Sequence, residues 1–131
     1  MLFNAISAII VIGVILMQPN SEMAEYVDTE GALSRIGGNM AIYKRLLGRF
    51  LEGNHYEQLD TALKGSDPEA AIRQAHSLKG VSANLSLVKI NSHTVQLEHL
   101  LKDGADYTSC MEELKDAFQV TTEMIAGILD S

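Results

Sequence analysis

The chain has 131 residues, a net charge of −7 at pH 7, a single cysteine and no tryptophan. This length suffices for one domain with a core of its own. The acidic balance excludes the basic surface that nucleic-acid binding requires. Cys110 has no second cysteine to pair with, which excludes an intrachain disulfide and suits a reducing compartment. Because prolines are few and β-branched runs are scarce beyond the N-terminus, the composition favours a small helical protein.

The first residues stand apart from the rest of the chain. Residues 2–17 are almost wholly apolar and uncharged, but they fall short of the roughly 20 residues of a membrane-spanning helix. They also lack the basic start and the cleavage site of a signal peptide. The segment either anchors the domain to a membrane, packs as a helix on the domain or between two copies, or is an artefact of start-site choice. Since Pro19 disfavours a continuing helix, we expect an N-terminal segment and linker over 1–21 and a bundle domain over 22–131.

Capping residues and glycines predict where the first helices of the domain begin and end. Asp28 or Thr29 can cap a short helix that ends at Gly37-Gly38. Asn39 can cap the longer helix that follows. The apolar face of this longer helix is expected to comprise Ile42, Leu46 and Phe50, with Tyr43 and Leu47 beside them.

The helical pattern after Asn39 is interrupted once. Gly53-Asn54 breaks it, and Asn54-x-x-Glu57 is typical of a capping box. The helix that restarts there carries Leu59 and Leu63 and continues to residue 64. We therefore expect 39–64 to act as one member of a bundle, in two pieces.

The stretch from Asp67 to Leu85 predicts a helix with two distinct faces. Asp67 can accept a hydrogen bond from a free backbone N–H, and Pro68 suits the first helical turn. One stripe at helical spacing can be buried, and it comprises Ala71, Ala75, Leu78, Ser82 and Leu85. A second stripe then faces water, and it comprises Arg73, His76, Lys79, Gly80 and Ala83.

Two further helices complete the predicted domain. The inner stripe of residues 87–102 comprises Leu87, Ile90, Thr94, Leu97 and Leu101, and Asp103-Gly104 ends that helix. The inner stripe of residues 106–129 comprises Met111, Leu114, Phe118, Thr121, Ile125 and Ile128. Because short connections make neighbouring helices antiparallel, we expect an all-α, antiparallel four-helix bundle. Its members are 39–64, 68–85, 87–102 and 106–129, with the short helix near 29–37 covering one end.

The exposed stripe around His76 suits phosphoryl chemistry. A neutral imidazole nitrogen is a nucleophile near neutral pH. Lys79, three residues later, and Arg73, three residues earlier, lie within side-chain reach and can balance the charge of a phosphate. Gly80 leaves room for a partner to close over the ring, and a glycine inside a helix costs roughly 1 kcal/mol relative to alanine. The alternative is a surface histidine on an ordinary helix beside an incidental glycine.

The sequence His76-Ser-Leu-Lys79-Gly80, followed by Asn84-Leu85, resembles the signature of histidine-containing phosphotransfer (HPt) domains. Weaker similarity extends from Tyr26-Val-Asp28 and Leu33-Ser-Arg-Ile-Gly-Gly-Asn39 through Leu97-Glu98 to about residue 129. One departure is Ser86, which occupies a turn position that is often glycine in this family.

The resemblance implies a phosphorelay intermediate in bacterial two-component signalling. A receiver domain would transfer a phosphoryl group from its phospho-aspartate to His76, and a second receiver would take it. The residues assigned to this site are His76, Lys79 and Gly80, with Arg73 and Ser77 in support. The partners would be receivers and a hybrid histidine kinase, the Mg²⁺ would belong to the receiver, and the chain would need no cofactor and have no kinase activity of its own. We expect it in the cytoplasm, with attachment to the inner membrane through residues 2–17 as an option.

Two alternatives remain open at this level. The domain could be an adaptor that binds receivers without accepting phosphate, or a membrane-tethered helical interaction bundle. The remaining histidines do not suggest a metal site, because His93 and His99 lie about 240° apart around a helix and no Cys/His pair has ligand spacing. No glycine-rich phosphate loop follows a strand, so we expect no ATP site.

Overall fold

The computed structural model describes residues 19–131, and their side chains from residue 23. The helices are α2 (Pro19–Tyr26), α3 (Thr29–Arg35), α4 (Met40–Glu52), α5 (His55–Lys64), α6 (Pro68–Asn84), α7 (Val88–Asp103) and α8 (Thr108–Leu129). The described residues contain no strand, only an isolated antiparallel bridge between Val27 and Leu87. The all-α class is therefore confirmed. The predictions about residues 2–17 lie outside the described part of the chain.

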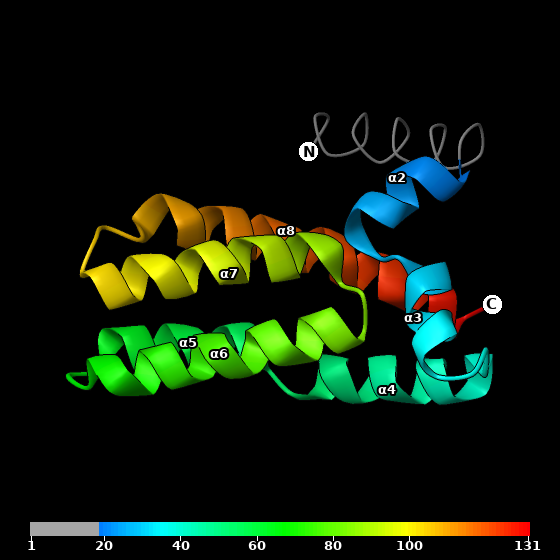
Figure 1. Cartoon of the computed structure of the whole chain (residues 1–131), viewed down its shortest axis with the longest axis horizontal. Coiled ribbons are helices and arrows are strands. Elements are labelled where there is room, and N and C mark those ends of the chain that lie inside the picture. The colour runs from blue at the N-terminus through cyan, green and yellow to red at the C-terminus, as the bar shows by residue number, and fades with distance from the viewer. Residues whose placement is uncertain (1–18) are drawn as a thin grey trace.

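The helices form an antiparallel bundle with α2 and α3 at one end (Figure 1). Neighbours along the chain lie side by side in space: α5 packs on α6, α6 on α7, and α7 on α8. Helices α4 and α5 both run along the long axis of the molecule, and α4 packs on α8. The pair α4–α5 therefore forms the fourth member of the bundle. The expected four-member bundle is thus confirmed, and one member is broken at Gly53-Asn54.

The core contains the apolar stripes that the sequence predicts for the last three helices. Every member of the predicted α6 stripe is buried, together with Leu85 at its end. The stripes of α7 and α8 are buried too, except that Leu101 and Phe118 keep partial exposure. Their burial drives assembly, because each fully buried Leu or Ile contributes roughly 1.5–3 kcal/mol through the hydrophobic effect.

Local capping explains where several helices begin. The carboxylate of Asp28 accepts a hydrogen bond from the backbone N–H of Gly31, and Asn39 accepts one from Ile42. Asp67 accepts from the N–H groups of Glu69 and Ala70 at 3.1 and 3.3 Å. These caps satisfy N–H groups that have no partner within the first turn of a helix. The predicted starts of α3, α4 and α6 are confirmed.

The prediction for the inner face of α4 is confirmed for Phe50, Tyr43 and Leu47 and is wrong for Ile42. Tyr43 and Leu47 are fully buried beside Phe50, whereas Ile42 is 40% exposed and Leu46 is only partly buried. The reason is tertiary: the hydroxyl of Tyr43 donates to the backbone carbonyl of Leu85 at 2.8 Å, which turns this side of α4 toward the end of α6.

The capping box predicted at Asn54 is also wrong. Asn54 has left-handed backbone angles, with φ at 50°, and its side chain makes no capping hydrogen bond. The amide of Gln58 donates instead to the backbone carbonyl of Gly53 at 2.7 Å. An N-cap residue normally has extended backbone angles, which let its side chain reach the first turn, and the left-handed angles of Asn54 do not provide that geometry.

The linker predicted within residues 1–21 is not observed from residue 19 onward. Pro19 is the first residue of α2. A proline ends a helix that arrives from upstream, but it also suits the first turn of a helix that starts with it, because its N–H would be unpaired there anyway. The sequence pattern did not distinguish these two cases.

Ser86 shows why the turn between α6 and α7 favours glycine. Its φ is +55°, in the left-handed region that is costly for residues with a side chain. Three contacts hold it there. The N–H of Asp28 donates to its carbonyl at 2.9 Å, its own N–H donates to Ala83, and the Arg35 guanidinium donates to its hydroxyl. The segment between α2 and α4 therefore stabilises the end of the α6 helix.

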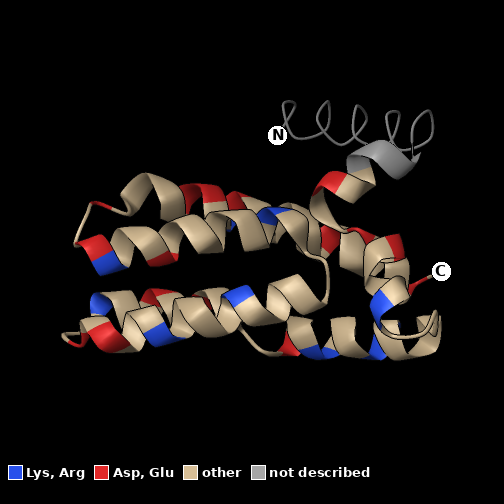
Figure 2. Cartoon of the chain, viewed as in Figure 1, with Lys and Arg blue, Asp and Glu red and all other residues tan. Residues whose placement is uncertain are grey.

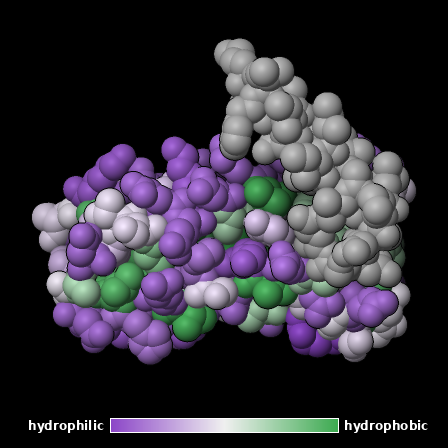
Figure 3. All heavy atoms as spheres, turned by 90° about the horizontal axis from the view of Figure 1, so that it is seen from above, coloured by the Kyte–Doolittle hydropathy of each residue, from purple (hydrophilic) through white to green (hydrophobic). Residues whose placement is uncertain are grey.

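Within residues 19–131, no helix is both long and apolar enough to cross a membrane. On the face seen from above in Figure 3, outside the grey atoms, hydrophobic residues form separate patches among hydrophilic ones. The large hydrophobic side chains that remain exposed in the described residues are Met40, Ile42 and Val88.

Candidate functional site

Helix α6 presents His76 to solvent. Burial of Ala75 and Leu78 against the rest of the bundle turns the opposite side of the helix outward. The side chain of His76 is consequently 69% exposed, and Gly80, one turn later, is exposed as well. The predicted division of α6 into a buried and an exposed face is confirmed.

A buried carboxylate on α7 contacts the exposed histidine. Glu98 has a side chain only 6% exposed, and its Oε2 lies 3.0 Å from Nδ1 of His76. Its Oε1 lies 2.6 Å from Nζ of Lys79. Lys102, one turn further along α7, places its Nζ 3.3 Å from Oε2. We call these four residues the Glu98 cluster.

The surrounding cations hold Glu98 in its ionised form. Its pKa falls to about 2, chiefly through the hydrogen bond from Lys79, against the opposing effect of burial and with help from His76 and Lys102. An ionised carboxylate can only accept hydrogen bonds, so the 3.0 Å contact requires the ring proton to be on Nδ1 of His76. In the neutral form of the ring, the other nitrogen, Nε2, therefore has the free lone pair.

A polar contact between α6 and α7 fixes the register that this site needs. The side-chain amide of Asn91 donates to the backbone carbonyl of Lys79 at 3.0 Å and to Oγ of Ser82 at 3.2 Å. Asn91 lies two helical turns before Glu98 on α7. Because the two helices are antiparallel, this anchor determines which residue of α7 faces His76.

Gly80 has no packing reason to be glycine. Apart from its chain neighbours and the nearby backbone of its own helix, a Cβ atom at this position would meet no atom within 4 Å. Its φ is also not among the positive values found at Gly37, Gly38 and Gly104. Neither steric contacts nor the backbone conformation within the described chain requires glycine at this position.

The supporting residues predicted from sequence lie outside the Glu98 cluster. Arg73 is on the same exposed stripe as His76, but its guanidinium lies 3.8 Å from the carboxylate of Asp67, at the start of α6. Ser77 is exposed beside His76 along the helix. Lys and Arg residues occur singly along α6 and α7 rather than as one basic face (Figure 2). Lys79 and Lys102 against Glu98 leave a local charge of +1, not counting His76.

The other histidines and the cysteine have ordinary surroundings. Nδ1 of His93 lies 3.3 Å from the exposed carboxylate of Glu113. The buried thiol of Cys110 donates to the carbonyl of His93, and burial raises the pKa of this thiol. Among residues 19–131, no group of three or more His, Cys, Asp or Glu side chains is placed to hold a metal ion.

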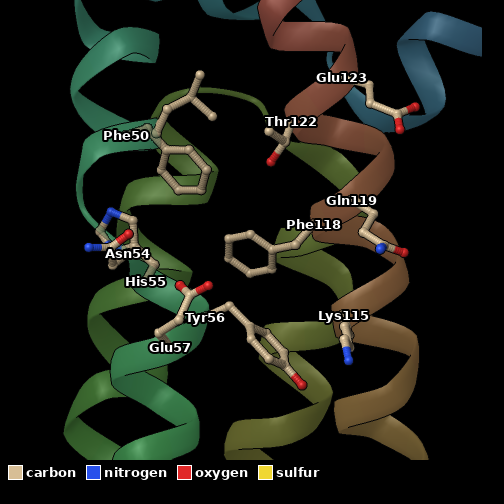
Figure 4. Close-up of a pocket in the computed structure, with 11 residues that line it drawn as sticks. Phe50, Asn54, His55, Tyr56, Glu57, Lys115, Phe118, Gln119, Thr122 and Glu123 are labelled. Atoms are coloured by element: carbon tan, nitrogen blue, oxygen red, sulfur yellow. The ribbon is translucent and has the colours of Figure 1, made fainter.

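A pocket of about 550 Å³ lies elsewhere on the bundle, between the α4–α5 junction and α8 (Figure 4). Four rings form its aromatic wall. The ring of Phe50 stacks on that of His55, with 4.8 Å between the ring centroids, and on that of Phe118, with 5.9 Å between them. Tyr56 and Phe118 pack edge to face. Burial there lowers the pKa of His55. No residue of α6 or α7 lines this pocket, so it is separate from the site around His76.

Sequence reasoning missed the roles of Glu98, Lys102 and Asn91. A signal for Glu98 was present: it lies four residues after Thr94 and three before Leu101, so it belongs to the inner stripe of its helix. A charged residue at such a position needs a partner of opposite charge. Which partner it finds depends on the register of α7 against α6, and that register is not visible in the sequence.

The fold and site together define a class of protein: a helical bundle with an exposed histidine, His76, that a buried carboxylate orients. Residues 45–128 match the family model described as Hpt domain, which covers more than half of the chain. The chain therefore belongs to the Hpt domain family. Members of this family are phosphoryl carriers rather than kinases, and they interact with receiver domains in two-component phosphorelays. Searches of curated proteins and of solved structures found no match.

Proposed function

We propose that this chain is a phosphorelay intermediate whose phosphoryl acceptor is Nε2 of His76. A phospho-aspartate of one receiver domain supplies the phosphoryl group, and the aspartate of a second receiver takes it. The observation that carries this proposal is the contact between Nδ1 of His76 and the buried carboxylate of Glu98, which leaves Nε2 free on an exposed ring.

The bonds formed and broken in the transfer balance without any further reactant. The lone pair on Nε2 forms the N–P bond while the bond between phosphorus and the aspartate oxygen breaks, and the receiver keeps its carboxylate. The ring of His76 gains a positive charge, which the neighbouring carboxylate of Glu98 stabilises through the Nδ1 proton. The onward step is the reverse: a second aspartate attacks phosphorus, the N–P bond breaks, and the ring returns to its neutral form.

The remaining residues act on charge and access. Lys79, three residues after His76, reduces repulsion as negative charge gathers on the transferring oxygens, and Arg73 contributes from the other side. Gly80 lets the receiver approach the ring, which agrees with the open space around its Cβ position. The receiver brings the acidic pocket and the Mg²⁺ with it, and a hybrid histidine kinase supplies the first phosphoryl group.

The test is phosphoryl transfer from a phosphorylated receiver domain to the full-length chain and to two variants. We expect wild type to acquire a phosphate that is acid-labile and base-stable, and His76→Gln to acquire none while keeping its helical circular dichroism. His99→Gln is the matched control, because it makes the same change at another exposed histidine of the bundle. It should be phosphorylated as wild type is.

Two results would contradict the proposal. If folded His76→Gln still takes up acid-labile phosphate, another residue is the acceptor. If wild type takes up none from several receivers yet binds them, the domain is an adaptor instead.

A further inference from the structure

We propose that Lys102 is a positioning residue that replaces Lys79 as the partner of Glu98 when the phosphoryl group arrives on His76. Lys79 then leaves the carboxylate for the phosphoryl oxygens, and Lys102 keeps the carboxylate on Nδ1 of the ring. This inference rests on the proposed function of His76 and concerns how the same site holds its geometry through the reaction.

Lys79 cannot serve both groups at once. Its Nζ is bound to Oε1 of Glu98 at 2.6 Å, on the side of the imidazole that carries Nδ1. The phosphoryl group would be attached to Nε2, on the opposite edge of the ring from Glu98. A cation that neutralises the phosphoryl oxygens must therefore give up its close contact with Oε1.

The departure of Lys79 would leave Glu98 poorly compensated. The carboxylate is 6% exposed, so little water is available to replace the lost hydrogen bond. Lys79 is also the largest of the influences that lower the pKa of Glu98. A buried carboxylate that loses its main cation either becomes protonated or moves toward water. In both cases the contact that orients the His76 ring weakens during transfer.

Lys102 is placed to prevent this. Its Nζ already lies 3.3 Å from Oε2 of Glu98, and its side chain is 56% exposed, so it has freedom to shift between the two carboxylate oxygens. It follows Glu98 by four residues on α7, the favoured order for a Glu–Lys pair on a helix. Because both residues belong to one helix, their contact does not depend on the position of the Lys79 side chain on α6.

The experiment measures how fast the full-length chain is phosphorylated, with three lysine variants compared. Phosphoramidate, a small phosphoryl donor, transfers its phosphoryl group to an imidazole nitrogen and releases ammonia, so the assay needs no receiver. We expect Lys102→Gln to slow the reaction by roughly two- to fivefold, the range that a partly exposed ion pair can supply. Lys102→Arg should restore the rate. Lys64→Gln removes another acid–lysine pair at i,i+4, Asp60 and Lys64 on α5, which has no contact with Glu98, and it should change nothing.

A second measurement separates this role from a general effect of positive charge. In a Glu98→Gln background, Lys102→Gln should cause no further change, since Lys102 acts through the carboxylate. On phosphorylation of wild type, the ¹⁵N signal of the Lys79 ammonium should shift strongly, whereas that of Lys102 should show a stronger hydrogen bond to Glu98.

These measurements distinguish a failure of the role proposed for Lys102 from a failure of the function proposed for His76. If wild type is phosphorylated and Lys102→Gln behaves like Lys64→Gln, the role of Lys102 is overturned and the relay function stands. The same holds if the Lys79 ammonium remains on Glu98 after phosphorylation. If wild type takes up phosphate from neither phosphoramidate nor receivers, both proposals fail together.

Discussion

Glu98 is the residue on which the chemistry of the site depends most directly. A histidine on a helix surface has two possible tautomers and a freely rotating ring. The ionised carboxylate at 3.0 Å removes both freedoms by requiring a proton on Nδ1. His76 is thereby given one defined nucleophilic atom without being buried, which a partner protein can approach.

The low pKa of Glu98 predicts how the stability of the domain depends on pH. Since this pKa falls from 4.5 to about 2 on folding, the ionised carboxylate contributes stability that is complete above pH 5. That contribution is lost as the pH falls through the folded value. Glu98→Gln should therefore be less stable than wild type at pH 7, and the difference should shrink steadily between pH 5 and pH 2.

Chemical denaturation at a series of pH values measures this difference. Glu113→Gln is the control, because Glu113 also contacts a histidine Nδ1 but is 56% exposed, so its difference should be smaller. A constant difference between Glu98→Gln and wild type down to pH 2 would show that the carboxylate is not held ionised by its neighbours.

At the scale of single helices, α6 contains a glycine that costs stability and that no internal contact explains. Helix-interior glycine is less favourable than alanine by roughly 1 kcal/mol. Gly80 and Gly48 are equivalent in this respect, because a Cβ at either position would meet open space. Gly48 lies on α4, away from His76, so it provides a matched control for Gly80.

We predict that Gly80→Ala and Gly48→Ala each raise the free energy of unfolding by about 1 kcal/mol. Only Gly80→Ala should slow transfer from a phosphorylated receiver, since only there would the added methyl group stand between the partner and the ring. Urea denaturation and transfer kinetics on the same preparations give the two readouts. Equal transfer rates for the two variants would remove Gly80 from the docking surface.

At the scale of the whole molecule, the segment before α4 and the end of α6 form one structural unit. Val27 pairs with Leu87, Arg35 donates to the carbonyl of Ala83 at 2.9 Å, and Tyr43 donates to that of Leu85 at 2.8 Å. These contacts join parts of the chain more than 40 residues apart. They hold the C-terminal end of the helix that carries His76.

Tyr43 makes this coupling measurable. Burial raises the pKa of Tyr43 to about 12, so the folded protein keeps the phenol proton at pH values where the unfolded chain loses it. The corresponding stability is complete below pH 10 and is lost as the pH rises through 12. Tyr43→Phe should cost about 1–2 kcal/mol at pH 7, because the Leu85 carbonyl loses its donor.

Between pH 10 and pH 12, Tyr43→Phe should lose less of its free energy of unfolding than wild type does. Thermal unfolding followed by circular dichroism tests this, with Tyr107→Phe as the control for the same change at a half-buried tyrosine. If Tyr43→Phe and wild type lose stability in parallel over this range, the phenol of Tyr43 is not the group responsible.

The sequence by itself determined the features that depend on neighbours along the chain. Asp28, Asn39 and Asp67 cap the helices that were predicted for them, and the inner stripes of α6, α7 and α8 are buried as expected. The exposure of His76 followed from the same periodicity. These features are local because hydrogen bonds at a helix start and the 3.6-residue repeat involve residues only a few positions apart.

Only the tertiary structure decided which residues meet across helices. Three features depend on how one helix is placed against another. They are the burial of Tyr43 with Ile42 left exposed, the left-handed backbone of Asn54, and the contact between His76 and Glu98. His76 and Glu98 are 22 residues apart, and a shift of α7 by one residue would rotate Glu98 by 100° away from the ring. Helix register is set by the packing of the whole core, and no short stretch of sequence contains that information.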